Sequence, residues 1–77
     1  MSSFKIGIIG AGYIARKHLE VIKKINGLKP VSITSRTYSK AEKIAKDFNI
    51  QNVFKNINSL IKKSNPDALL ILVSSEN

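Results

Sequence analysis

Small residues at a fixed spacing follow an apolar run near the N-terminus. The stretch IGIIGAGYIARKH contains Gly10, Gly12 and Ala15 in the pattern G-x-G-x-x-A. Gly10 permits a tight turn, Gly12 leaves the backbone open to a ligand, and Ala15 lets a helix pack closely on a strand. The first amides of a helix lack intrahelical acceptors, so those of Tyr13 and Ile14 favour a phosphate. The pattern predicts a site for the diphosphate of a dinucleotide; the alternative is a strand-to-helix turn without a ligand.

A second group of polar residues decides which dinucleotide is expected. Ser35, Arg36 and Thr37 stand about twenty residues after the glycines, where an NAD site usually has Asp or Glu for the ribose hydroxyls. Arginine instead pairs with a 2′-phosphate and stacks on adenine, and the Ser35 and Thr37 hydroxyls can donate to that phosphate. Lys40 adds positive charge or is a solvated lysine, and Arg36 is otherwise an ordinary loop arginine. The missing carboxylate favours NADP over NAD.

Candidates for catalysis are scarce. His18 is the only histidine, and its place three residues after Ala15 indicates packing or a hydrogen bond that secures the turn rather than proton transfer. Ser74, with Ser75 and Asn77, follows a final apolar run, where it either touches the cofactor or ends a strand. Five scattered acids, one histidine and no cysteine provide no nucleophile–base pair and no metal cluster. We assign no catalytic residue and no metal ligand.

The elements that must position these residues alternate between strand and helix. Short apolar, β-branched runs predict four strands, at residues 4–9, 30–34, 53–54 and 68–73. Apolar stripes at helical spacing predict three helices, at 13–25, at 39–48 and around Leu60.

Local signals set the ends of these helices. An Asn-Gly pair at 26–27 stops the first helix, and Ser39 with Glu42 forms a capping box at the start of the second. Either Asn56 or Asn58 caps the third. The proline at position 30 is tolerable only at the beginning of its strand.

This order predicts an α/β fold of the Rossmann type. Strands that alternate with helices indicate a doubly wound parallel sheet, here with strand order 3-2-1-4. The sheet is partial, because a fifth strand would normally follow, and the run at 68–73 is too apolar for a sheet edge. We therefore expect residues 1–77 to be the N-terminal part of an NAD(P)-binding Rossmann domain, with the remainder absent.

The composition limits the partners. A hydrophobic share of 43% predicts a folded core. The net charge of +8 comes from lysines scattered over the three expected helices, with no aromatic interleaving, which indicates a solvated surface rather than nucleic-acid binding. No apolar run could span a bilayer, no secretory leader is visible, and cysteine is absent. We expect a cytoplasmic protein without a membrane partner.

The sequence resembles the N-terminal domain of the glucose-fructose oxidoreductase, inositol dehydrogenase and MocA family. The resemblance rests on G-x-G-x-x-A-x-x-H at 10–18, on Ser-Arg followed by Lys-Ala within 35–41, and on PDALLILVSSEN at 66–77. It implies that the full-length protein is an NADP-dependent oxidoreductase that moves hydride between nicotinamide and a sugar, polyol or related compound. One departure is VSSEN, where many relatives have Thr-Pro-Asn before a histidine.

The resemblance also places the chemistry elsewhere. The family's catalytic lysine and its Asp/His pair would lie beyond Asn77, and a missing C-terminal domain would bind the small-molecule substrate. We expect the full-length protein to be a homo-oligomer. The alternative is a non-catalytic nucleotide-sensing Rossmann module, which uses the same turn without a hydride acceptor. A third alternative, charge-driven nucleic-acid binding, predicts salt-sensitive association without base preference.

Overall fold

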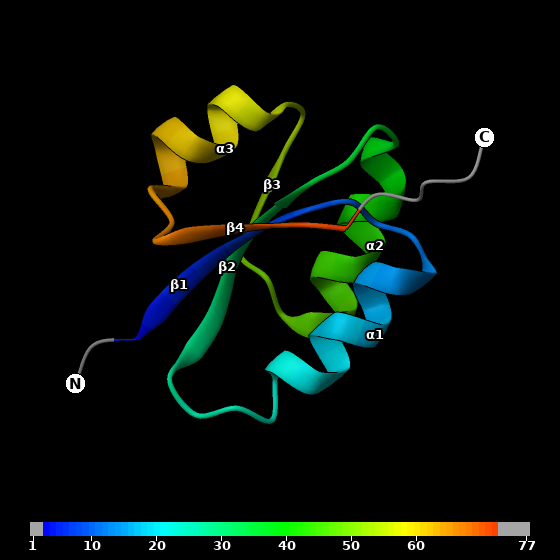
Figure 1. Cartoon of the computed structure of the whole chain (residues 1–77). Coiled ribbons are helices and arrows are strands. Elements are labelled where there is room, and N and C mark those ends of the chain that lie inside the picture. The colour runs from blue at the N-terminus through cyan, green and yellow to red at the C-terminus, as the bar shows by residue number, and fades with distance from the viewer. Residues whose placement is uncertain (1–2, 73–77) are drawn as a thin grey trace.

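Strands and helices alternate along the whole of the chain that the structure describes. The computed structural model describes residues 3–72. The strands are β1 (Phe4–Ile9), β2 (Leu28–Thr34), β3 (Asn52–Phe54) and β4 (Ala68–Ile71), and the helices are α1 (Tyr13–Ile22), α2 (Tyr38–Phe48) and α3 (Ile57–Ser64) (Figure 1). The β-α-β-α-β-α-β order predicted from the sequence is confirmed.

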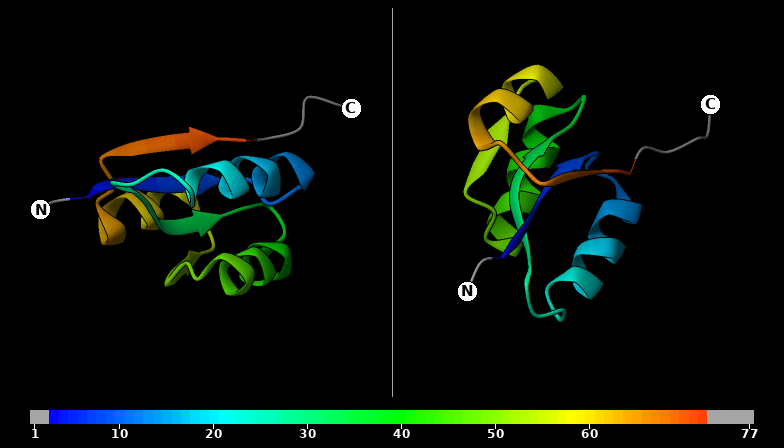
Figure 2. Two further views of the ribbon diagram at one scale, coloured as in Figure 1. Left: turned by 90° about the horizontal axis from the view of Figure 1, so that it is seen from below. Right: turned by 60° about the vertical axis from the view of Figure 1, so that its left-hand side comes forward.

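The strands form one parallel sheet in the order β3-β2-β1-β4 (Figure 2). This order is the predicted 3-2-1-4. Helices α1 and α2 lie on one face of the sheet and α3 lies on the other, so the sheet is doubly wound (Figure 1). Because all strands run the same way, the turns that follow β1, β2 and β3 meet at a single edge.

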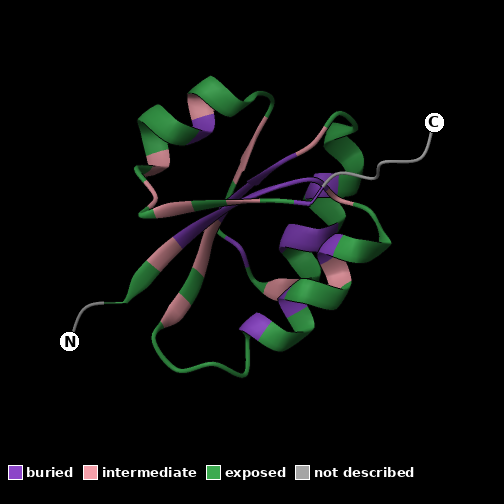
Figure 3. Cartoon of the chain, viewed as in Figure 1, coloured by how far each residue is buried: buried purple, intermediate pink, exposed green. Residues whose placement is uncertain are grey.

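The main core lies between the sheet and the pair α1 and α2. Ile8 of β1 and Ile33 of β2 are fully buried there. Each helix contributes a stripe of residues spaced three and four apart, the period that brings side chains to one face. The buried members are Ala15, Leu19 and Ile22 of α1 and Ala41, Ile44 and Ala45 of α2 (Figure 3).

The other face of the sheet allows α3 to come close. Gly7 of β1 lies opposite Leu60 of α3, and a Cβ built on Gly7 would stand 2.8 Å from Leu60 Cδ2. Leu60 is fully buried in this contact. The hydroxyls of Ser32 and Ser64 share a hydrogen bond of 2.8 Å between β2 and α3. Small residues on this face therefore determine how closely the third helix packs.

Two predicted boundaries between α1 and β2 are wrong. Helix α1 ends at Ile22 rather than at residue 25, because the amides of Lys24 and Ile25 bond to carbonyls three residues back and tighten the last turn. Strand β2 begins at Leu28, upstream of Pro30. The register with β1 shifts between Ile6 and Gly7, next to the Ile6–Pro30 pair, and this irregularity accommodates a residue without an amide hydrogen.

The capping box predicted for α2 is also wrong. Helix α2 begins at Tyr38 with Thr37 as its N-cap, so Ser39 lies inside the first turn. The Ser35 hydroxyl accepts from the Thr37 amide at 3.1 Å and donates to the Thr37 carbonyl at 2.7 Å. This local turn starts the helix one residue before the predicted cap.

The remaining boundaries follow the sequence closely. Asn56 caps α3, since its Oδ1 accepts from the Ser59 amide at 2.8 Å, whereas Asn58 lies within the helix. Strand β3 begins one residue earlier than predicted, at Asn52. The apolar run at 68–73 forms β4 up to Ile71, and position 73 lies outside the described residues. None of the helices within residues 3–72 is long and apolar enough to cross a membrane.

Replacing Asn56 with alanine is expected to lower the free energy of unfolding by about 1 kcal/mol, because the Ser59 amide loses its acceptor. Asn58→Ala is the matched control: Asn58 is exposed inside α3, and alanine is the better helix former there. Urea unfolding of both variants checks the difference. Equal losses in the two variants would contradict the assignment of the cap.

Candidate dinucleotide-binding site

The turns that follow the first three strands enclose a cleft at the carboxyl edge of the sheet. Its volume is about 850 Å³. The lining comprises residues 9–14 after β1, 34–37 and Lys40 after β2, 55–57 after β3, and Leu72. Most of the predicted site residues are therefore brought together in one cleft. Ligands of open α/β sheets bind at this edge, where the chain order reverses between β1 and its neighbours.

Gly10 fixes the turn at the end of β1. Its φ is +124°, in the region that only glycine adopts readily, and a Cβ there would strike the carbonyl group of Leu72. Its amide donates to the Thr34 carbonyl at 2.8 Å, and the Leu72 amide donates to Ile9 at 2.7 Å. The fold itself therefore requires glycine at position 10.

Gly12 differs from Gly10 in what surrounds it. It is the N-cap of α1 with φ −91° and ψ −164°, an extended conformation open to any residue. Apart from its two chain neighbours, no atom of residues 3–72 lies within 4 Å of a Cβ built on it. The space beside Gly12 is thus left open to the cleft. Neither the packing of residues 3–72 nor the backbone conformation requires glycine at this position.

The positive end of α1 faces that open space. The first hydrogen bond of this helix runs from the Arg16 amide to the Gly12 carbonyl at 3.3 Å. The amides of Tyr13 and Ile14 precede it, so they have no acceptor within the helix. No acidic residue stands in the first turn of α1. Backbone amides and helix dipole together suit an anion, while Ala15, fully buried, lets the helix lie close to the sheet.

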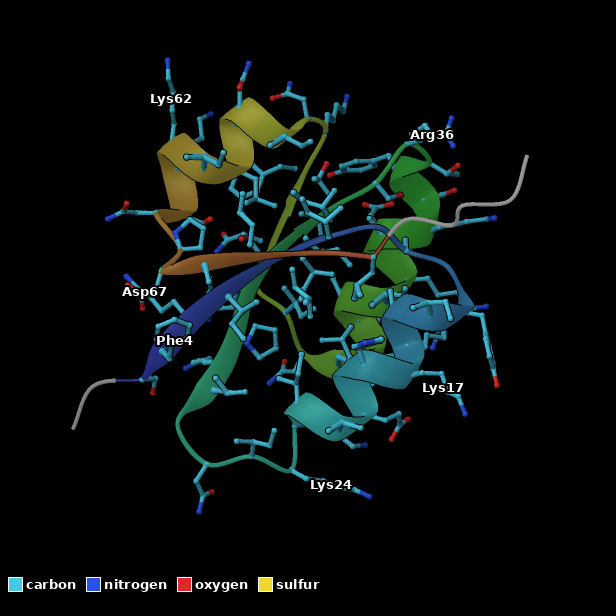
Figure 4. All side chains as sticks on the ribbon, viewed as in Figure 1. Phe4, Lys17, Lys24, Arg36, Lys62 and Asp67 are labelled. Atoms are coloured by element: carbon cyan, nitrogen blue, oxygen red, sulfur yellow. The ribbon has the colours of Figure 1, made fainter. Side chains whose placement is uncertain are left out.

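The turn after β2 carries the charged part of the site. Arg36 and Lys40 are exposed and line the cleft, and Figure 4 shows Arg36 at the turn before α2, directed away from the sheet. Within residues 3–72 the ion pairs are Arg16–Asp47 and Lys23–Glu20, and neither engages these two cations. The Ser35 hydroxyl hydrogen already goes to the Thr37 carbonyl, so Ser35 is less free to donate to a ligand than the sequence predicts.

Residues 4–77 match the model of the oxidoreductase family with an NAD-binding Rossmann fold, Gfo/Idh/MocA. The matched residues include the glycine turn after β1, the described residues that line the cleft and all four strands of the sheet. The chain belongs to this family. The resemblance noted from the sequence is thereby confirmed, and the Gfo/Idh/MocA fold accounts for the strand order and for the glycine turn after β1.

Several Gfo/Idh/MocA relatives are similar over nearly the whole chain. A 4-carboxy-2-hydroxymuconate-6-semialdehyde dehydrogenase of Sphingobium sp. (strain SYK-6) is 26% identical over 72 residues, which cover 94% of this chain and 23% of that protein. The structure of scyllo-inositol dehydrogenase from Lactobacillus casei, with NAD(H) and scyllo-inositol bound, is 27% identical with a TM-score of 0.84, covering 96% of this chain and 22% of that one.

A third relative shares the fold at lower identity. It is a variant of a 3-ketoreductase from Actinomadura kijaniata in complex with NADP, 20% identical with a TM-score of 0.82, covering 94% of this chain and 23% of that one. The chain thus spans less than a quarter of the length of each of these three relatives.

Two residues considered in the sequence, Ala15 and His18, do not line the cleft of this Gfo/Idh/MocA chain. His18 is exposed, and its Nδ1 hydrogen-bonds to the Ile14 carbonyl at 3.0 Å within α1. Of the two alternatives considered for His18, the structure shows a hydrogen bond rather than packing. Ser74 lies outside the described residues.

Sequence reasoning missed the third wall of the cleft. Lys55, Asn56 and Ile57 line it from the turn after β3. The Lys55 ammonium lies over the Tyr38 ring, 5.5 Å from its centroid. The signal in the sequence was the position of Lys55 directly after an apolar pair, the place that Ser35 holds after β2.

Proposed function

We propose that this chain is the NADP(H)-binding portion of an oxidoreductase that transfers hydride between nicotinamide and a sugar, a polyol or a related substrate. The observation that carries the proposal is one cleft that joins an unfilled space beside Gly12 to an arginine at the end of β2. The first feature suits a diphosphate and the second suits a 2′-phosphate. The names of the three relatives, each a dehydrogenase or a reductase, support the reaction class.

The residues of the cleft fit such a cofactor. The amides of Tyr13 and Ile14 would hold the diphosphate at the position that a Cβ on residue 12 would fill. Arg36 would hold the 2′-phosphate, with Lys40 and the Thr37 hydroxyl as further partners. When bound, the nicotinamide supplies or accepts the hydride. The part of the chain described here binds and orients the coenzyme, and we place substrate binding and proton transfer in another part of the protein.

The residues at the end of β2 favour NADP over NAD as the coenzyme. Both coenzymes occur among the relatives, since one structure holds NAD(H) and another NADP. Among the described residues, the lining of this cleft contains no Asp or Glu that could accept the adenosine ribose hydroxyls, and it contains Arg36 where that acid is usual. A carboxylate would repel a 2′-phosphate, whereas a guanidinium attracts it.

Titration of the intact protein with NADPH and with NADH tests this proposal. We expect NADPH to bind roughly ten times more tightly or better, the effect of one charge-assisted hydrogen-bonded pair. Quenching of nicotinamide fluorescence or calorimetry would report both dissociation constants. Tighter binding of NADH, or binding of neither coenzyme, would contradict it.

A further inference from the structure

Ser35 and Lys55 are the first residues after two neighbouring strands, β2 and β3. The last paired residues of β2 and β3 are Thr34 and Phe54, so the next residue on each strand begins its turn at the same level. The Thr34 hydroxyl donates to the Phe54 carbonyl at 2.7 Å and fastens the two strand ends together. Neighbouring strands lie about 4.8 Å apart. The turn that carries Lys55 therefore starts beside the turn that carries Arg36 (Figure 1).

The strand order separates Lys55 from the glycine turn. In the order β3-β2-β1-β4, β3 lies on the far side of β2 from β1. A diphosphate held by the amides after β1 is thus one strand further from Lys55 than a group held at the end of β2. The adenosine ribose of a dinucleotide lies at the end of β2. A phosphate on that ribose would therefore lie closer to Lys55 than the diphosphate would.

Lys55 completes a group of three cations around this end of the cleft. Arg36, Lys40 and Lys55 all line it, and none of the lining residues within 3–72 is acidic. Neither ion pair formed among residues 3–72 involves any of the three. Their charge is therefore available to a ligand with more negative charge than a diphosphate alone supplies.

Tyr38 restrains the Lys55 side chain. The Lys55 ammonium lies 5.5 Å from the centroid of the Tyr38 ring, within the range of a cation–π contact. Tyr38 is the first residue of α2 and directly follows the 35–37 turn. A lysine side chain otherwise samples many rotamers, so this contact keeps its charge beside the first residue of α2 at a lower entropic cost on binding.

We propose that Lys55 is a second cation for the 2′-phosphate of NADP(H) and that Tyr38 is its positioning residue. The inference rests on the proposed function and adds to it a specificity residue from a third turn. Lys55 acts as a point charge beside the planar, bidentate guanidinium of Arg36. Side chains from the turns after β2 and after β3 would then both bind the adenosine end of the coenzyme.

The test compares five forms of the intact protein: the wild type, Lys55→Met, Lys55→Arg, Lys63→Met and Arg36→Ala. Lys63 is the matched control, because it is an exposed lysine of α3 that does not line the cleft. We expect Lys55→Met to raise the Kd for NADPH roughly two- to fivefold, the upper part of the range for an exposed charge pair. The Kd for NADH should stay unchanged. Lys55→Arg should retain most of the NADPH affinity, and Lys63→Met should change neither constant.

The outcomes separate this inference from the proposed function. If the wild type shows no preference for NADPH, both fail. If Arg36→Ala removes the preference while Lys55→Met leaves it intact, the inference about Lys55 is wrong and the proposed function stands. An equal loss for NADH and NADPH in Lys55→Met would also overturn the inference, because it would indicate a structural or diphosphate role.

A double-mutant cycle tests the role of Tyr38. Tyr38→Leu should raise the Kd for NADPH about two- to fivefold, the effect of a lost cation–π contact. Tyr38→Phe should retain most of the wild-type affinity for NADPH, because its ring can make the same contact. In the Lys55→Met background Tyr38→Leu should have no further effect on NADPH binding. Effects that multiply independently would contradict positioning by Tyr38.

Discussion

Replacing Gly12 with valine is expected to abolish tight dinucleotide binding while the protein stays folded. Position 12 has backbone angles that valine adopts, and a Cβ there meets no atom of the described chain within 4 Å beyond its own neighbours. The new side chain would instead occupy the space through which a diphosphate reaches the amides of Tyr13 and Ile14. We expect the Kd to rise about 100-fold or more, the equivalent of one or two charge-assisted hydrogen bonds. Stability should fall by only about 1 kcal/mol, since valine is a poorer N-cap than glycine.

Gly10→Ala is the contrasting variant. Its φ of +124° costs an alanine about 1–2 kcal/mol by itself. The Cβ would also strike the Leu72 carbonyl group, so the end of β1 must move. This variant should lose stability and binding together, whereas Gly12→Val should lose binding alone. Thermal unfolding and NADPH titration of both proteins check this separation, and wild-type NADPH affinity in Gly12→Val would contradict the assignment of the turn.

Changing Arg36 to aspartate is expected to reverse the coenzyme preference. The variant loses a charge-assisted pair with the 2′-phosphate, about 1.5–3 kcal/mol or roughly 10- to 100-fold in Kd for NADPH. The new carboxylate repels that phosphate and accepts hydrogen bonds from the ribose hydroxyls of NADH. The ratio of the two dissociation constants, measured on the wild type and on Arg36→Asp, reports the change.

The chain offers one matched control for this substitution. Arg16 is the only other arginine, and it pairs with Asp47 at 2.9 Å outside the cleft. Arg16→Gln removes the same charge and breaks an exposed ion pair worth about 1 kcal/mol or less. It should leave the ratio of NADPH to NADH affinity unchanged. If Arg36→Asp discriminates between the coenzymes as the wild type does, Arg36 is not the 2′-phosphate ligand.

The fold could be predicted from local patterns because each element carries its own. Strand β1 begins and ends where its apolar run does, at Phe4 and Ile9, since a strand between two others is buried on both faces. The boundaries of the helices were harder to predict. The capping box at Ser39 satisfies the sequence rule, yet the Ser35 turn starts α2 earlier, and competition between two local motifs is not visible in either motif alone.

The parts of the candidate site that lie in one continuous stretch of sequence could be predicted. The glycine turn and Arg36 each follow a recognisable strand, so their places at the sheet edge follow from the order of the elements. Lys55 follows a strand of only three residues, so the apolar pair before it is a weak signal in the sequence. Its role in the cleft arises from the pairing of β3 with β2, a contact between segments twenty residues apart in the sequence.

A crystal structure of the intact protein with NADPH is the most direct test of the central claim that this cleft holds a phosphorylated dinucleotide. We expect the diphosphate at the amides of Tyr13 and Ile14 beside Gly12, and the 2′-phosphate within hydrogen-bonding distance of the Arg36 guanidinium. A coenzyme bound with its diphosphate away from the turn after β1, or with its 2′-phosphate pointing into solvent away from Arg36, would contradict the claim.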